Sequence, residues 1–102
     1  MYASITTVQV QPGKTDEAMR VRRDSVVPLA RQHAGYRGAL AFVDPDANRI
    51  TTVMLWETRP DLEAFATSEG YQEQLRRVGP LLAGPPERQV CEVDLSEVVV
   101  QP

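Results

Sequence analysis

Side chains that transfer protons near neutral pH or hold metal ions are few in this chain. It contains one histidine, His33, and one cysteine, Cys91, among 102 residues. One of each cannot supply the ligands of a His/Cys metal site, and a lone cysteine cannot form a disulfide within the chain. With no activating partner near it in sequence, Cys91 is interpreted as a small buried residue of a strand. We therefore expect any catalysis here to proceed without a metal ion held by the usual ligands.

His33 is the default general base, because imidazole exchanges protons near neutral pH. Residues 14–33 show helical spacing, and Arg22 and His33 project onto the apolar face of that helix. The apolar positions on this face are Ala18, Met19, Val26, Leu29 and Ala30. An arginine facing inward could stabilise a phenolate or an enolate. Alternatively, Arg22 extends past the helix edge, and Pro28, which should kink or divide the helix, turns His33 to solvent.

Composition indicates a single globular domain. The chain is 42% hydrophobic and 25% charged, with a formal net charge of −3. This mild acidity argues against a nucleic-acid or anionic-membrane partner. No apolar run approaches the ~20 residues that span a bilayer, and the N-terminal residues lack the layout of a signal peptide. We expect a cytoplasmic protein with one domain over residues 1–102, comprising a core at 2–95 and a C-terminal tail at 96–102.

The order of predicted elements is strand, helix, strand, strand, helix, strand. Runs of β-branched and alternating residues predict strands at 2–11, 36–43, 49–57 and 87–95. Helical spacing and start signals predict helices at 14–33, 60–67 and 71–78, with Thr58 as the N-cap of the second. The five residues 44–48 between the central strands suit a hairpin turn and are too few for a parallel crossover. This order predicts a ferredoxin-like α+β fold, with an antiparallel sheet and both helical regions on one face.

Both faces of the predicted sheet are apolar. In the third strand Met54 and Trp56 lie on one face, and Val53 and Leu55 on the other. The second strand places Tyr36, Leu40 and Phe42 opposite Ala39, Ala41 and Val43. Helices cover one face only, so the other would remain a large apolar patch. We therefore expect a homodimer through the sheet face. The apolar segment Val98–Val100 would pack on the partner as a strand or strap, or on its own subunit.

At this level of detail the chain resembles the antibiotic biosynthesis monooxygenase family of dimeric α+β barrels. The resemblance covers residues 2–95 and is carried by four short motifs. They are Gly35-Tyr36-Arg37-Gly38, Trp56-Glu57, Leu62-Glu63-Ala64 and Ser68-Glu69-Gly70-Tyr71. These motifs specify the fold more closely than the activity. The family includes cofactor-independent oxygenases of anthrones and quinols, heme-degrading members and many proteins with no established reaction.

The resemblance implies roles for individual residues. Trp56 matches the strand tryptophan that lines the family's pocket, and Tyr71 matches the aromatic at the start of the next helix. Two positions depart from the pattern: Thr52 stands where anthrone-oxidising members often carry Asn, and Phe65 where a His is common. Heme-degrading members need an axial His near the second helical region, and this chain has none there. That branch therefore does not fit.

The resemblance favours a cofactor-independent monooxygenase acting on a small electron-rich aromatic of quinol or anthrone type. Trp56, Tyr71 and Phe65 would line the pocket, while Thr52, Arg22 and His33 would supply its polar contacts. The catalytic candidates are His33, Arg22 and Trp56. The alternative function is a non-catalytic small-molecule-binding or stress-related protein of the same fold, in which Trp56 is simply core. The missing Asn and His favour that alternative, because both changes remove polar groups from the expected pocket.

Overall fold

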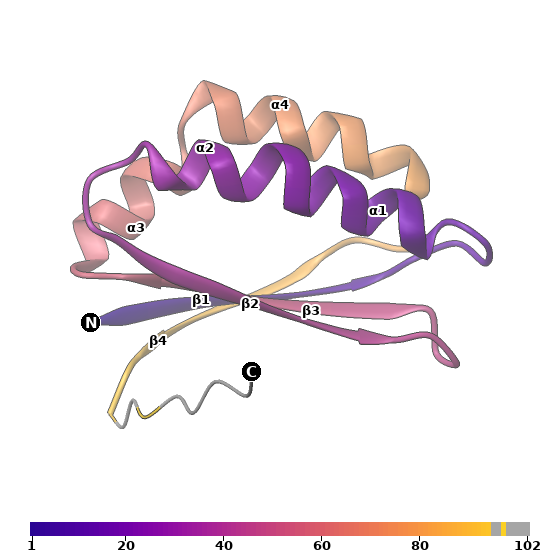
Figure 1. The fold of residues 1–102 in the computed structure, drawn as a ribbon, viewed down its shortest axis with the longest axis horizontal. Helices are drawn as coiled ribbons and strands as arrows, with labels where there is room; N and C mark the ends of the chain where they lie inside the picture. The colour runs from indigo at the N-terminus through magenta and orange to yellow at the C-terminus, as the bar shows by residue number, and fades with distance from the viewer. Residues whose placement is uncertain (95–96, 98–102) are drawn as a thin grey trace.

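A four-stranded antiparallel sheet covered on one face by helices forms the molecule (Figure 1). The structure, a computed structural model, describes residues 1–94 and 97. Its strands are β1 (Tyr2–Gln9), β2 (Tyr36–Asp44), β3 (Arg49–Trp56) and β4 (Glu87–Glu92), in the spatial order β2-β3-β1-β4. The main helices are α1 (Thr15–Val21), α2 (Val27–Arg31), α3 (Arg59–Ala66) and α4 (Glu69–Val78). The predicted ferredoxin-like α+β fold is confirmed. The predicted strap Val98–Val100 lies outside the described residues.

The first helical region is continuous but changes its pitch in the middle. Between α1 and α2 the chain makes a π-helical turn, η1 (Arg22–Val26), with helical dihedral angles at its flanking residues Val21 and Val27. Pro28 lies in the first turn of α2. The predicted division near Pro28 is therefore a widened turn within one helix. Because a π turn takes up about one extra residue, α2 is rotated by about 100° relative to an uninterrupted α-helix.

The β2–β3 hairpin contains one irregularity that changes which side chains face the helices. A bulge between Tyr36 and Gly38 shifts the register, and Gly38 adopts a φ of 143° that favours glycine. Tyr36 therefore lies opposite Trp56 on the helix face, with 5.6 Å between their ring centroids. The sequence prediction that Tyr36 shares a face with Leu40 and Phe42 is wrong, because alternation does not reveal the extra residue.

Side-chain N-caps begin both α3 and α4. The Thr58 hydroxyl accepts a hydrogen bond from the Asp61 N–H at 3.2 Å, which confirms the predicted N-cap. The Ser68 hydroxyl accepts one from the Tyr71 N–H at 3.3 Å and begins α4. The Ser68 cap lets α4 start within three residues of the end of α3.

Helix α4 is held at both of its ends. At its first turn a Cβ on Gly70 would lie 2.9 Å from Cδ2 of Leu29, so glycine permits close packing against α2. Beyond its last turn, the Gln11 N–H donates to the Leu81 carbonyl at 2.9 Å, and Leu82 forms a β-bridge with Val10. The middle of α4 spans the sheet between these two attachments (Figure 1).

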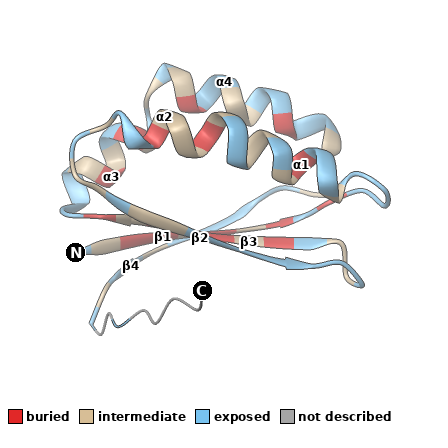
Figure 2. Cartoon of the chain, in the orientation of Figure 1, coloured by how far each residue is buried: buried red, intermediate tan, exposed pale blue. Residues whose placement is uncertain are grey.

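Burial differs sharply within the sheet: buried residues lie on β1 and β3, whereas β2 and β4 carry only intermediate and exposed residues (Figure 2). Toward the helices, β1 and β3 carry buried side chains, including Val8, Ile50, Met54 and Trp56. On the other face Leu40 and Phe42 are 45% and 56% exposed, beside the half-buried Val53 and Leu55. Cys91, on the outer strand β4, is exposed as well, which corrects its interpretation as a buried residue. Within residues 1–94 and 97, no element covers the predicted apolar face.

Among residues 1–94 and 97, no helix has the length and apolar character needed to cross a membrane.

Candidate functional site

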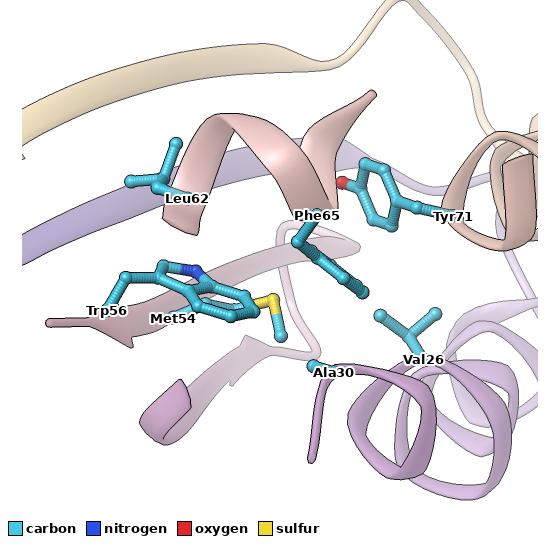
Figure 3. Packing of buried hydrophobic residues seen from close by; sticks show 7 residues of the cluster. All are labelled: Val26, Ala30, Met54, Trp56, Leu62, Phe65 and Tyr71. Carbon is cyan, nitrogen blue, oxygen red and sulfur yellow. The ribbon is translucent and has the colours of Figure 1, made fainter. Parts of the chain in front are cut away.

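At one end of the layer between sheet and helices, aromatic side chains fill the space. Trp56 is completely buried, and Phe65 packs on it with 5.1 Å between ring centroids (Figure 3). Phe65 in turn packs on Tyr71, with 4.8 Å between ring centroids. The void that Trp56 lines measures only about 10 Å³, roughly the room that one water needs. We call this group the aromatic cluster; its members are Trp56, Phe65, Tyr71, Met54, Leu62, Val26 and Ala30.

His33 lies at the outside of the aromatic cluster. Its ring is half-buried and meets Phe65 edge to face, with 5.1 Å between centroids. The side chains lining the cavities described below do not include His33. Arg22 and His33 would share a face of a regular α-helix, but the π turn rotates α2 by about 100°. In addition, α2 ends at Arg31, so His33 lies beyond the helix.

Beside the aromatic cluster the same layer is hollow. A cavity of about 230 Å³ lies between α4 and the sheet. It is lined mainly by apolar or small side chains, and we call it the apolar cavity; its lining includes Thr6, Val8, Arg22, Val26, Tyr71, Leu75, Val78 and Leu82. An apolar cavity of about 150 Å³ in another protein accommodates benzene. This cavity therefore has room for a somewhat larger ring system.

A second cavity, of about 260 Å³, lies between the first helical region and strands β2 and β3. Three arginines line it, Arg22, Arg23 and Arg31, and we call it the basic cavity. Thr52 contributes to its lining as well and is only 2% exposed. The Thr52 hydroxyl has no hydrogen-bond partner within the described part of the chain. Burying an unsatisfied hydroxyl costs about 1–3 kcal/mol.

Arg22 lies at the boundary between the two cavities, since it lines both. Beneath it, Thr6 lines the apolar cavity and Thr52 the basic cavity, and these two residues lie directly opposite each other in the β1–β3 register. The half-buried Arg22 takes part in none of the ion pairs found among residues 1–94 and 97. Its positive charge is therefore available to a ligand at the junction.

The structure divides the six predicted site residues into two groups. Arg22, Thr52 and Tyr71 line the cavities. Trp56, Phe65 and His33 lie in or against the aromatic cluster. Tyr71 belongs to both groups, because it packs on Phe65 and also lines the apolar cavity.

Sequence reasoning identified Tyr71 of α4 but missed the other residues that α4 and β1 contribute to the site. Leu75 and Val78 follow Tyr71 at spacings of four and seven residues, and all three line the apolar cavity. That helical spacing was a readable signal. Thr6 carried no comparable signal, because threonine is common on strands. Within the described residues, no cluster of three or more His, Cys, Asp or Glu side chains could hold a metal ion.

Comparisons with known proteins agree on the fold. A model of the antibiotic biosynthesis monooxygenase family matches residues 1–77. A candidate antibiotic biosynthesis monooxygenase from Bordetella bronchiseptica is 27% identical, with 92% of this chain and 97% of that chain covered and a TM-score of 0.80. The monooxygenase of ActVA-Orf6 from Streptomyces coelicolor, solved with nanaomycin D, is 16% identical, with 97% and 92% covered and a TM-score of 0.79. The search of curated proteins gives no match.

Proposed function

The chain belongs to the antibiotic biosynthesis monooxygenase family, and on that premise we propose that it oxygenates a small electron-rich aromatic, such as a quinol or an anthrone, without a cofactor. The observation that carries this proposal is the apolar cavity of about 230 Å³ with the Arg22 side chain in its wall. Such a cavity can bind a flat ring while one cation stabilises negative charge on the substrate oxygen.

In the proposed reaction the substrate supplies the electrons. Loss of a proton gives a phenolate or enolate, which Arg22 stabilises at the junction of the cavities. One electron passes from this anion to O₂, and the resulting radical and superoxide combine at the ring carbon. Loss of water from the peroxide leaves a new carbonyl. In an anthrone, a ring CH₂ and O₂ become C=O and H₂O, whereas a quinol and O₂ become a hydroxyquinone and H₂O. The protein contributes a dry pocket and fixed polar groups.

Tyr71 would form one wall of the binding site and Thr52 would offer its hydroxyl to a substrate oxygen. Phe65 would hold Tyr71 in place, with 4.8 Å between their ring centroids. Trp56 would in turn support Phe65, with 5.1 Å between their ring centroids. The role of His33 as general base stays a prediction. Its ring contacts Phe65, so the substrate or the helix would have to shift for a direct proton transfer.

Oxygen consumption with a panel of reduced quinols and anthrones tests the proposal. We expect turnover that falls by about 10²-fold in Arg22→Gln, as when a single oxyanion-stabilising group is removed. His33→Ala and Trp56→Phe then test the two remaining candidates separately. Arg20→Gln, an exposed position on α1, is the matched control. Folded protein that consumes no oxygen above the buffer rate with any member of the panel would contradict the proposal.

A second candidate function is binding without turnover. The observation that favours it is the position of Phe65, an apolar ring packed into the cluster where related oxygenases commonly carry a His. In that case an oxidised quinone and its reduced quinol should bind with similar affinity, and neither should consume oxygen. Calorimetric titration of both forms under nitrogen, followed by exposure to air, separates the two functions.

We also propose that two copies of this chain associate through the uncovered sheet face. Leu40 and Phe42, at 45% and 56% exposed, form with Val53 an apolar surface that a second copy would remove from water. Sedimentation should give a dimer for the unmodified chain and a monomer for Phe42→Asp, with Arg20→Gln remaining dimeric. A monomer at every concentration of the unmodified chain would contradict the proposal.

A further inference from the structure

The basic cavity holds an unusual local excess of positive charge. Arg22, Arg23 and Arg31 all line it, in a chain whose net charge is −3. None of the three takes part in an ion pair found in the described part of the chain. Arg23 and Arg31 are exposed and Arg22 is half-buried, so a bound anion can reach them from solvent and would give them a counter-charge.

Thr52 adds a hydrogen-bond donor to the same place. Its hydroxyl is buried and has no partner among the described residues, although the Thr52 side chain lines the basic cavity. A hydroxyl group together with guanidinium groups is a suitable donor set for an oxyanion, because each can donate to a carboxylate oxygen. A bound oxyanion would satisfy the Thr52 hydroxyl and the arginines at once.

The position of Arg22 connects this charge to the apolar cavity. The same side chain lines both spaces, and Thr6 and Thr52 lie side by side on the sheet below it. A ligand that fills both cavities must therefore have an apolar body at one end and an anionic group at the other. Arg22 would lie beside the bond that joins the two parts.

We propose that the ligand of this site is an aromatic acid, with its ring in the apolar cavity and its carboxylate or other oxyanion in the basic cavity. This inference rests on the proposed function for the location of the site and adds the chemical class of the substrate. Arg23 and Arg31 act as anion-binding residues beyond the ring.

Calorimetric titration with three probes tests the proposal: 2-naphthoate, its neutral analogue 2-naphthalenemethanol, and inorganic phosphate. We expect 2-naphthoate to bind at least tenfold more tightly than either of the other probes, as for hydrogen bonds to charged groups. Arg31→Gln and Thr52→Val should each weaken naphthoate binding about three- to tenfold, and Arg31→Gln, which removes only a charge, should weaken the binding of the neutral analogue much less. Arg20→Gln, which removes the same charge outside the cavities, should change neither. Raising the salt concentration should weaken only the naphthoate complex.

Each alternative outcome has a defined meaning. Equal affinity for the acid and the alcohol would overturn the anionic class while leaving an aromatic site. Phosphate that binds as tightly as naphthoate would overturn the contribution of the ring. Equal effects of Arg31→Gln and Arg20→Gln would show that the arginines act only through net charge and would overturn the assignment of the basic cavity. Selective naphthoate binding without oxygen consumption for any reduced aromatic would support this inference and contradict the monooxygenase.

Discussion

The two ends of the layer between sheet and helices are built from different side chains. Around Trp56 the remaining void is about 10 Å³, whereas under the middle of α4 the apolar cavity measures about 230 Å³. Large rings from β3, α3 and α4 fill the first end. The floor of the second end carries Thr6 and Val8, which are too short to reach α4 across the gap.

The comparison shows how one layer can combine stability with binding. Aromatic side chains bury large areas and make specific contacts with one another, so the filled end stabilises the fold. Threonine and valine on the neighbouring strand positions keep the backbone regular but leave volume unfilled. Substitutions at the two ends should therefore change the free energy of unfolding in opposite directions.

The largest effect is expected at the filled end. Trp56→Ala should lower the free energy of unfolding by about 3–5 kcal/mol, since it removes a completely buried ring and leaves a cavity. Urea denaturation at a fixed protomer concentration measures this change. Trp56→Phe, which keeps a ring in place, should cost clearly less. A loss below about 1 kcal/mol for Trp56→Ala would contradict the view that the filled end stabilises the fold.

Thr52→Val should change stability in the opposite direction. It replaces an unpartnered buried hydroxyl by a methyl group of similar shape, so the free energy of unfolding should rise by about 1–2 kcal/mol. Thr7→Val is the control, because it removes a hydroxyl that has a partner, Thr51 at 3.4 Å, on the face away from the helices, and it should bring no such gain in stability. A destabilised Thr52→Val protein would show that its hydroxyl is satisfied in solution, and would weaken the contrast between the ends.

The turn that begins α4 connects the filled end of the layer to the open end. Ser68→Ala should cost about 1 kcal/mol, because the Tyr71 N–H loses its side-chain acceptor. Ser68→Asp, which retains an acceptor at the N-cap, should recover most of this loss. Thermal unfolding of the three proteins gives the ranking, and equal midpoints for Ser68→Ala and the unmodified chain would contradict a role for this cap.

The smallest change in stability is expected from Leu75→Phe, at the open end. Leu75 is half-buried and lines the apolar cavity, so a larger ring can enter the existing space with a change of less than about 1 kcal/mol. The same substitution should remove the binding of 2-naphthalenemethanol by filling its site. Unfolding and titration of the same preparation measure both effects. Full ligand affinity in Leu75→Phe would place the ligand elsewhere.

Much of the fold was predictable because it depends on local signals. The alternation of β3, the turn before Arg49 and the N-cap at Thr58 each depend on residues close together in the sequence. Each appears as expected, with Ile50, Met54 and Trp56 buried on one face. The bulge at Arg37 was not predictable from alternation, although Gly38 was available to permit it.

The site was less predictable because it depends on volume and helical phase. Helical spacing placed Arg22 and His33 together, but the π turn that begins at Arg22 rotates α2, and the helix ends at Arg31, before His33. Trp56 was correctly assigned to the inner face, yet only packing against Phe65 and Tyr36 decides whether that face is filled or open. Such contacts join residues from different elements, and no spacing rule within one element reports them.

The double attachment of α4 has a consequence for the kinetics of ligand binding. The close packing of Gly70 on Leu29 and the bridge between Leu82 and Val10 fix both ends of the helix that roofs the apolar cavity. The roof therefore keeps its position without an occupant, and a ligand need not order it on entry. Preorganisation of this kind lowers the entropic cost of association. We expect the observed association rate to rise linearly with ligand concentration, with no plateau from a slow conformational step.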